Sequence, residues 1–265
     1  MDLGLKDRVA LVVAASKGLG FAAAQELVRE GAKVAICSRS QARTDAAVAR
    51  LRQEAASAAH VVGYEMDVTD PAQIAQLVEK TAAQFGGIDI LITNAGGPPG
   101  GTFDSTDVTA WEQAFHLTLM SVTHLVKAAL PHLRQSSAAS ILTITSFSVK
   151  EPVPGLLLSN VIRPSVVGLT KALAQELGRE NIRANSILPG WTATERVDEI
   201  MAYRAQQNGT TAEAERAKIA GTIPLGRMGE PAEFGRVAAF LVSPAASYVS
   251  GVMIQVDGGS YRGLL

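Results

Sequence analysis

The sequence RVALVVAASKGLG, at residues 8–20, joins a short apolar run to a turn that carries Gly18 and Gly20. An almost wholly apolar run of this length is typical of a strand buried on both faces of a parallel sheet. Glycines after such a strand let the backbone approach a ligand, and the following helix offers unpaired N–H groups that suit a pyrophosphate. Taken alone, the turn does not distinguish a nucleotide site from an ordinary connection between a strand and a helix.

The same alternation of apolar runs and longer Ala-rich amphipathic segments continues along the chain. The predicted strands cover residues 8–14, 33–37, 61–65, 88–93, 140–145, 182–188 and 252–256, and helices are expected to begin near residues 18, 41, 71, 107, 154 and 231. Strands separated by crossover helices predict an α/β fold. We therefore expect a doubly wound, seven-stranded parallel sheet with helices on both faces, in one domain that spans residues 1–265.

The composition indicates a globular protein that binds neither nucleic acid nor a membrane. Its 265 residues include 24 Lys and Arg against 25 Asp and Glu, so no net field attracts anionic polymers or lipids. No apolar stretch approaches the roughly 18 residues that a membrane span needs. The single Cys37 forms no internal disulfide, and the first residues lack the form of a signal peptide, so we expect a cytoplasmic protein. His60, His124 and His132 lack the spacing of metal ligands, and no metal site is predicted.

Polar and glycine-bearing segments follow four of the other predicted strands. They are Asp67-Val68, Asn94-Ala95-Gly96, Pro189-Gly190 and Asp257-Gly258-Gly259. With the turn at 16–20, in this order and spacing, these segments resemble the short-chain dehydrogenase/reductase family, especially its beta-ketoacyl-acyl carrier protein reductases. The resemblance extends over essentially the whole chain and implies a single-domain Rossmann fold that binds a dinucleotide.

The resemblance assigns a dinucleotide-binding role to residues that follow the strands. They are Ala14, Ser16, Lys17, Gly18, Leu19, Gly20, Ser38, Arg39, Asp67, Val68, Asn94, Ala95, Gly96, Arg163, Pro189, Gly190, Thr192 and Thr194. The glycine turn of the family reads Thr-Gly-x-x-x-Gly-x-Gly, and Val13 and Ala14 occupy its first two places here. Ala14 is tolerable at a negative φ and strained at a positive one. By resemblance Asp67 meets the adenine amino group and Asn94 steadies a strand end, although either side chain also suits the capping of a turn.

The end of the second predicted strand favours NADP(H) over NAD(H). Relatives that use NAD place an acidic residue there to bind the adenosine ribose, whereas this chain reads Ser38-Arg39. No carboxylate repels a 2′-phosphate at this position. Lys17 in the glycine turn is expected to lie close enough to help Arg39 bind that phosphate. The alternative is that both residues are solvated surface cations.

The expected reaction chemistry departs from the family pattern. Reductases of the family use an Asn, Ser, Tyr and Lys set, and the last two lie four residues apart on one helix face. Ser146 matches the catalytic Ser, whereas Thr118, Ser159 and Arg163 stand in the places of the Asn, Tyr and Lys. Ser159 lacks the acidity of a tyrosine, whose pKa is about 10, and loss of a positioned acid costs roughly 10²- to 10⁴-fold in rate. Arg163 keeps the positive charge, and we expect it to bind the cofactor.

Lys150 is the leading candidate for a replacement acid. It follows Ser146 by four residues on the loop after the fifth predicted strand, and a lysine beside a cofactor can have a pKa near neutrality. An exposed loop lysine is an equally good interpretation. Pro164, next to Arg163, removes an N–H from a predicted helix, so we expect either a kink or a later helix start.

Two segments interrupt the alternation, and both follow strands at the edge where α/β sheets bind ligands. A Gly- and Pro-rich loop covers residues 96–101, and a polar, partly helical segment covers residues 191–222. The second segment is interpreted as a substrate lid, with a plain surface insertion as the alternative. By resemblance, apolar helices at 111–133 and 156–177 would form the contacts of a homodimer or homotetramer, although the sequence equally permits them to face the core.

Two functions remain open on these observations. The first is an NADP(H)-dependent oxidoreductase that acts on a small-molecule carbonyl or secondary alcohol, similar to a 3-oxoacyl reductase but with an unusual active site. The second is a non-catalytic NADP(H)-binding sensor or regulatory protein. Ser159 favours the second, whereas Ser146 and the elaborate 191–222 segment favour the first, and the fold alone does not decide between them.

Overall fold

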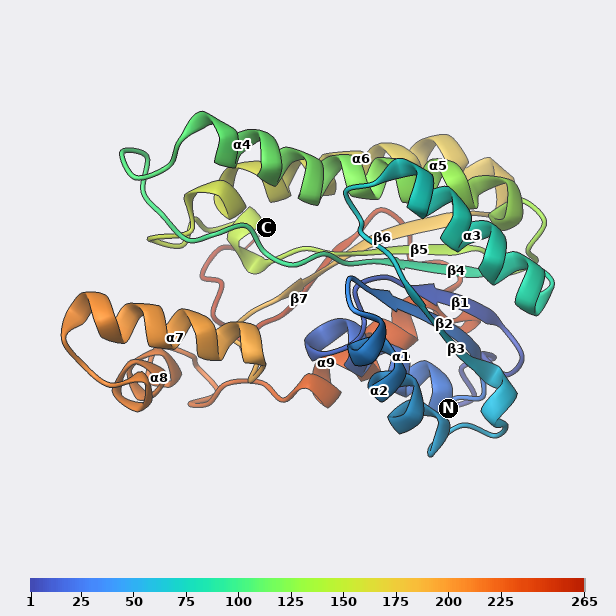
Figure 1. The fold of residues 1–265 in the computed structure, drawn as a ribbon, viewed down its shortest axis with the longest axis horizontal. Helices are drawn as coiled ribbons and strands as arrows, with labels where there is room; N and C mark the ends of the chain where they lie inside the picture. Colours follow the sequence, from blue (N-terminus) through green and yellow to red (C-terminus); the bar gives the residue numbers. More distant parts are fainter. Residues whose placement is uncertain (265) are drawn as a thin grey trace.

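The computed structural model describes residues 1–264, and its sheet has seven strands with every neighbouring pair parallel (Figure 1). The order is β3-β2-β1-β4-β5-β6-β7. The predicted α/β class and doubly wound parallel sheet are confirmed, and the predicted strand ends differ from the observed ones by no more than one or two residues. The strands are β1 (Val9–Val12), β2 (Lys33–Ser38), β3 (Val61–Glu65), β4 (Ile90–Thr93), β5 (Ser140–Ile144), β6 (Arg183–Pro189) and β7 (Met253–Val256).

The sheet is buried on both faces, and its strands therefore appear in the sequence as apolar runs. β1, β4 and β5 are buried along their whole length. Alternate side chains enter two cores on opposite faces, so Ala10 and Val12 lie in one core and Leu11 in the other. Figure 1 shows helices covering both faces. One face carries α1 (Gly18–Arg29), α2 (Gln41–Arg52) and α9 (Pro231–Val242), and the other carries α3 (Pro71–Phe85), α5 (Ser121–Leu133) and α6 (Leu157–Leu177).

Local capping and turn residues decide where the helices begin. α3 begins at Pro71 because the Asp70 carboxylate accepts the N–H groups of Ala72 at 2.9 Å and Gln73 at 3.2 Å. α6 begins at Leu157 rather than near residue 154, since the intervening Gly155 has a φ of 78°, outside the range of a right-handed helix. The start is thus three residues later than predicted, but the helix continues through Pro164 and does not begin at the proline.

Shorter elements complete the connections. α4 (Val108–Phe115) continues through a π-helical turn, η2 (His116–Met120), into α5. The remaining short elements are the single 3₁₀ turns η1 (Ala58–His60), η3 (Phe147–Val149), η4 (Gly178–Glu180) and η5 (Pro244–Ala246).

The topology opens a crevice beside β1. This strand pairs with β2 on one side and with β4 on the other. The chain leaves β1 into α1 on one face of the sheet and leaves β4 towards α4 and α5 on the opposite face. Connections that diverge in this way leave a ligand-binding crevice at the carboxyl ends of the two strands.

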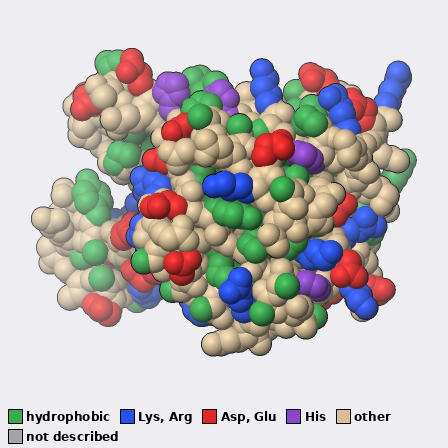
Figure 2. Space-filling model, turned by 45° about the vertical axis from the view of Figure 1, so that its right-hand side comes forward, with side chains coloured by type: hydrophobic (Ala, Val, Ile, Leu, Met, Phe, Trp, Pro, Cys, Tyr) green, Lys and Arg blue, Asp and Glu red, His purple; other side chains and the backbone are tan. Residues whose placement is uncertain are grey.

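The segment at 191–222 forms two helices, α7 (Glu195–Asn208) and α8 (Ala212–Ala220), that project beyond the sheet at the lower left of Figure 1. They enclose a small core of their own, formed by Val197, Met201, Ile223 and Met228. Figure 2 shows basic and acidic side chains interspersed over one face of the molecule. Among residues 1–264, no helix combines the length and apolarity that a membrane crossing requires.

Candidate functional site

A cleft of about 520 Å³ lies at the carboxyl ends of the strands, and its walls include α7. It brings together most of the residues that the sequence singled out. Those residues are Ala14, Ser16, Lys17, Gly18, Leu19, Ser38, Arg39, Val68, Asn94, Ala95, Gly96, Ser146, Ser159, Arg163, Pro189, Gly190, Thr192 and Thr194. Gly20, Asp67, Thr118 and Lys150 are not among the residues that line it.

The glycine turn forms one wall of the cleft. α1 begins at Gly18 without a side-chain cap, so the first N–H groups of the helix are left for a ligand. Ala14 has a φ of 51°, and its carbonyl accepts a hydrogen bond of 3.1 Å from Asn94 Nδ2. Gly20 lies behind the wall, where a Cβ atom would come within 2.8 Å of the Ala14 carbonyl oxygen. Its role is therefore to allow close packing of the helix on the turn.

Asp67 caps a turn in this structure. Its carboxylate accepts hydrogen bonds from the backbone N–H of Thr69 at 2.9 Å and from the Thr69 hydroxyl at 2.8 Å. The neighbouring Met66 and Val68 line the cleft, whereas Asp67 does not. The capping role that the sequence allowed is therefore present, and the expected contact of Asp67 with the adenine amino group stays a prediction. Asp257 likewise orders the final turn by accepting the N–H groups of Gly259 and Tyr261 at 2.9 Å each.

Basic side chains cluster at the carboxyl end of β2. Arg39 and Arg43 both line the cleft, and neither guanidinium has a hydrogen bond or ion pair within the described chain. The Ser38 hydroxyl already has a hydrogen-bond partner nearby, since it lies 2.8 Å from Thr44 Oγ1. Lys17 lines the cleft as well, but its ammonium lies 3.8 Å from Glu199 on α7. Sequence reasoning missed Arg43, which lies four residues after Arg39 in the first turn of α2.

Cys37 closes the floor of the cleft beside these cations. The side chain is fully buried, and burial raises the pKa of its thiol to about 12. The thiol is therefore protonated and unreactive at neutral pH.

Ser159 and Arg163 lie on one face of α6 and are joined directly. Arg163 Nε donates a hydrogen bond of 3.0 Å to Ser159 Oγ, because residues four apart on a helix face the same way. Arg163 Nη1 donates to the carbonyl oxygens of Thr145 at 3.0 Å and Ile144 at 3.5 Å, which anchors the side chain to the end of β5. Burial, together with the positive charge of Arg196, lowers the pKa of Arg163 to about 10.

Ser146 lines the same cleft from the end of β5. Its hydroxyl oxygen accepts the N–H of Ser148 at 3.1 Å, which fixes the side chain at the start of η3. The hydroxyl proton of Ser146 is not used by this bond and is free to be donated.

Thr118 does not reach the cleft. It lies in η2 with 5% of its surface exposed, and its hydroxyl has no hydrogen-bond partner within residues 1–264. The neighbouring Leu117 lines the cleft instead. Adjacent residues of a helix point in different directions, and the alignment of motifs does not reveal which of the two faces the cleft.

Lys150 also lies outside the cleft. Its ammonium stands 5.1 Å above the ring of Tyr261. With the Gln255 amide oriented so that both of its polar atoms are satisfied, the Gln255 oxygen accepts a hydrogen bond of 3.1 Å from Lys150 Nζ. In this arrangement Lys150 is held against the carboxyl-terminal segment rather than beside Ser146.

The wall formed by α7 and the residues before it contains side chains that no motif indicated. Trp191 packs against Phe147, with ring centroids 6.3 Å apart, and both line the cleft. Arg196 reaches across the mouth of the cleft, where its Nη2 donates a hydrogen bond of 2.9 Å to the carbonyl of Pro98 in the Gly- and Pro-rich loop. The two segments that interrupted the strand–helix alternation therefore meet at the cleft, as their positions suggested.

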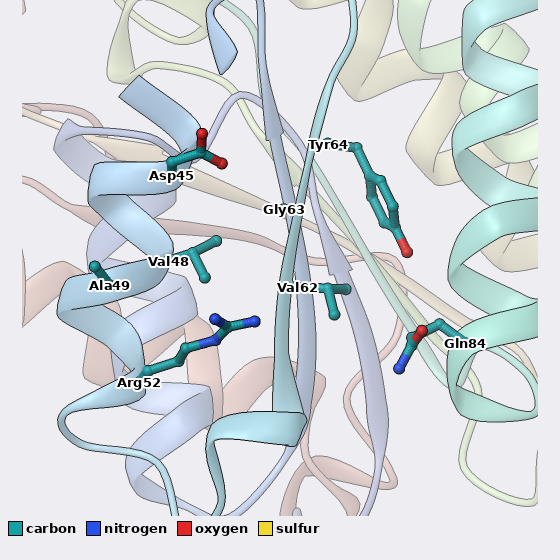
Figure 3. Close-up of a pocket in the computed structure, with 8 residues that line it drawn as sticks. All are labelled: Asp45, Val48, Ala49, Arg52, Val62, Gly63, Tyr64 and Gln84. Carbon is teal, nitrogen blue, oxygen red and sulfur yellow. The ribbon is translucent and has the colours of Figure 1, made fainter. Parts of the chain in front are cut away.

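A second hollow, of about 470 Å³, lies at the edge of the sheet around β3 (Figure 3). Figure 3 shows Asp45 and Arg52 projecting from α2 on one side of β3, and Tyr64 and Gln84 on the other side. Arg52 is already bonded to the carbonyl of Val61 at 2.9 Å and 3.1 Å. None of the predicted site residues lines this hollow, and we place the functional site in the cleft.

Comparison with known proteins identifies relatives over nearly the whole chain. A family model described as "Enoyl-(Acyl carrier protein) reductase" matches residues 13–261. "Dehydrogenase/reductase SDR family member 4" of Caenorhabditis elegans is 34% identical over 253 residues, which cover 95% of this chain and 94% of the relative. The 3alpha-hydroxysteroid dehydrogenase of Mediterraneibacter gnavus is 31% identical over 260 residues, or 98% of this chain and 99% of the relative.

Solved structures show the same arrangement. L-sorbose reductase from Gluconobacter frateurii, complexed with NADPH and L-sorbose, superimposes with a TM-score of 0.94 at 28% identity and complete coverage of both chains. The NADPH-bound short chain oxidoreductase from Pseudomonas aeruginosa PAO1, described as containing an atypical catalytic center, gives a TM-score of 0.88 at 32% identity, with 97% and 99% of the two chains covered. The chain thus belongs to the short-chain dehydrogenase/reductase family, whose members are NAD(P)-dependent oxidoreductases of carbonyl and alcohol groups.

Proposed function

We propose that this protein is an NADP(H)-dependent carbonyl reductase, or dehydrogenase of the corresponding alcohol, in which Ser159 and Arg163 together replace the tyrosine and lysine of the family. The observation that carries the proposal is the 3.0 Å hydrogen bond from Arg163 Nε to Ser159 Oγ, in the cleft that Ser146 also lines. A half-buried guanidinium bound to a hydroxyl stabilises negative charge that develops beside that hydroxyl.

The cleft suits NADPH at several points. The uncapped first turn of α1 offers N–H donors for the pyrophosphate, next to an unhindered Gly18 whose φ is 61°. Arg39 and Arg43 offer two unpaired guanidinium groups for the 2′-phosphate, and no acidic residue from β2 lines the cleft. When bound, NADPH supplies the hydride.

The chain's own residues then have to hold the carbonyl and deliver a proton. Arg163 donates to Ser159 Oγ, so the hydroxyl proton of Ser159 is left for the substrate oxygen. Ser146 Oγ likewise accepts from a backbone N–H and keeps its own proton for donation. We propose that both hydroxyls bind the substrate oxygen, that the charge of Arg163 stabilises the alkoxide, and that Ser159 passes on a proton which solvent replaces.

Fluorescence titration tests the cofactor part of the proposal. NADPH is expected to bind more tightly than NADH, and Arg39→Gln and Arg43→Gln are each expected to weaken NADPH binding by roughly 10- to 100-fold, because each removes a charge-assisted contact. Binding of NADH serves as the internal control, since it has no 2′-phosphate and is expected to be nearly unchanged. Tighter binding of NADH than of NADPH would contradict the proposed phosphate site.

Turnover on a panel of aldehydes and ketones tests the catalytic part. Ser146→Ala and Ser159→Ala are each expected to lower kcat by roughly 10²- to 10³-fold with little change in NADPH affinity. Lys150→Ala is the matched control, because its ammonium lies against Tyr261, and full turnover is expected. Loss of turnover in that variant alone would restore the sequence-based assignment of Lys150 as the acid. Tight NADPH binding without turnover across the panel would support the sensor alternative.

A further inference from the structure

The end of the cleft that holds Ser146 and Ser159 contains a half-buried positive charge without a counterion, that of Arg163. The side-chain partners of Arg163 are the Ser159 hydroxyl and two backbone carbonyls, all of them neutral. Within the described chain, no carboxylate forms an ion pair with Arg163. A charge that is partly withdrawn from water is normally paired, because loss of its hydration is otherwise uncompensated.

Arg196 adds a second positive charge at the same end. Its side chain lines the cleft from the first turn of α7, and a Cβ atom on Gly97 would lie 3.4 Å from its Nε and Nη2. The guanidinium of Arg196 acts on that of Arg163 strongly enough to help lower its pKa. Arg196 Nε has no hydrogen-bond partner among residues 1–264, so this donor is available to a ligand.

The acidic side chains of the cleft do not neutralise this pair. Glu195 and Glu199 are the acidic residues that line it, and both lie on α7. Glu199 is shared, because it lies 3.3 Å from Arg196 and 3.8 Å from Lys17. Glu195 faces the glycine turn, with its carboxylate 3.8 Å from the position of a Cβ on Gly18. An excess of positive charge therefore remains beside the two serine hydroxyls.

We propose that the substrate carries a carboxylate, which Arg196 binds within the field of Arg163 while Ser146 and Ser159 hold the carbonyl, so that the substrate class is a small oxo acid. This inference rests on the proposed carbonyl reductase function. A guanidinium suits this task because its planar fork of donors matches the two oxygens of a carboxylate. The carbonyl carbon gains a hydride and its oxygen gains a proton, which gives the hydroxy acid, and NADPH is oxidised to NADP⁺.

Calorimetry on the complex with NADP⁺ tests the inference, because no reduction proceeds in that complex. The ligands are 2-oxobutyrate, acetoacetate and levulinate, each compared with its own amide. At least one acid is expected to bind roughly 10- to 100-fold more tightly than its amide, and Arg196→Gln is expected to abolish that difference. Lys218→Gln is the matched control, because it removes an exposed positive charge from the neighbouring α8 outside the cleft and is expected to keep the difference.

Two results overturn the inference: equal binding of acid and amide, or absence of binding by all three acids. A difference that persists in Arg196→Gln also overturns it. Failure of the proposed function has another signature, since it is measured as NADPH turnover with the same compounds. Selective binding of an acid without turnover would refute the reductase function and support the carboxylate site. Equal turnover of the amides and the acids would support the reductase function and refute the carboxylate site.

Discussion

Ala14 adopts a backbone conformation that the family pattern reserves for glycine. Its φ of 51° lies in the left-handed region, which costs an L-residue with a Cβ atom roughly 1–2 kcal/mol. Glycine avoids that cost but loses roughly 0.5–1 kcal/mol more in chain entropy on folding. We therefore expect Ala14→Gly to raise the free energy of unfolding, measured in urea, by about 0.5–1 kcal/mol.

Ala15→Gly is the natural comparison for this variant. Ala15 is fully buried and has no positive φ, so the same change at this position removes a packed methyl group without relieving any strain. Its free energy of unfolding is expected to fall by about 1 kcal/mol. Equal destabilisation by the two variants would show that the turn tolerates Ala14 without strain.

The depressed pKa of Arg163 predicts a loss of activity at high pH. Deprotonation near pH 10 removes the positive charge from beside Ser159, so kcat/KM for carbonyl reduction is expected to fall as the pH rises through about 10. Arg163→Gln should be slow at every pH and lack this decline. A wild-type rate that stays constant to pH 10.5, with circular dichroism showing an intact fold, would contradict the assignment.

The same shift affects stability with the opposite sign. The folded chain releases the Arg163 proton near pH 10, whereas the unfolded chain keeps it up to the higher, ordinary pKa of an arginine. The unfolded state thus holds more protons between these two values, and the contribution of this group to stability rises with pH in that window. Below pH 10 the half-buried charge is a constant destabilising contribution.

At the scale of elements, the contact between α1 and α9 depends on one glycine. A Cβ atom on Gly235 would lie 2.5 Å from the carbonyl oxygen of Ala22 and 2.9 Å from its carbon, both of them backbone atoms that cannot turn away. Gly235→Ala is therefore expected to lower the free energy of unfolding by about 1–3 kcal/mol.

Gly168 on α6 supplies the control for that variant. A Cβ atom there meets nothing within 4 Å, so Gly168→Ala should show only the helix-propensity gain of about 1 kcal/mol. Thermal unfolding of the two variants side by side measures the difference. Similar melting temperatures for Gly235→Ala and the wild type would mean that the contact between α1 and α9 accommodates the added methyl group without loss of stability.

Elements were predictable from sequence wherever a local cause acts. Asp70 and Pro71 mark the start of α3, and apolar runs buried on both faces mark the strands. Side-chain direction has no such local mark. Thr118 is buried in η2 while its neighbour Leu117 lines the cleft, and no local pattern shows which of the two faces inward. Lys150 is held away from the cleft by Tyr261 and Gln255, which lie more than 100 residues away in sequence.

The site residues contributed by α7 could not be predicted from the sequence either. Arg196 does not come directly after a strand and belongs to no motif that the sequence displays. It reaches the site because α7 lies along the cleft and places its side chain on the carbonyl of Pro98. Position along the chain predicted that the segment borders the pocket. It did not predict which of its charged side chains faces inward.

At the scale of the whole molecule, we expect the chain to self-associate through α4 and α6. Phe115 and Val161 lie on these helices with 43% and 52% of their surface exposed, beside a small core that joins the two elements. Sedimentation is expected to show a dimer or tetramer of the 27.7 kDa chain, and Phe115→Glu is expected to shift it towards the monomer. Tyr203→Glu, which changes a comparably exposed aromatic on α7, should leave the mass unchanged.

We also expect the chain to unfold as one domain. A single sheet runs through the molecule, and both of its cores draw on strands from the two halves of the chain. Calorimetry should therefore give one cooperative transition. Two resolved transitions, with the smaller one lost on deletion of residues 195–220, would show that α7 and α8 melt separately from the sheet.

The burial of Cys37 makes the chain a convenient background for site-specific labelling. It is the only cysteine in the sequence, it has no exposed surface, and its thiol is protonated far above neutral pH. A cysteine introduced at the exposed position of Lys218 would be the one thiol that maleimide reagents reach, without any need to replace the native residue. A fluorophore attached there would report whether α8 moves when nucleotide and oxo acid are added in turn.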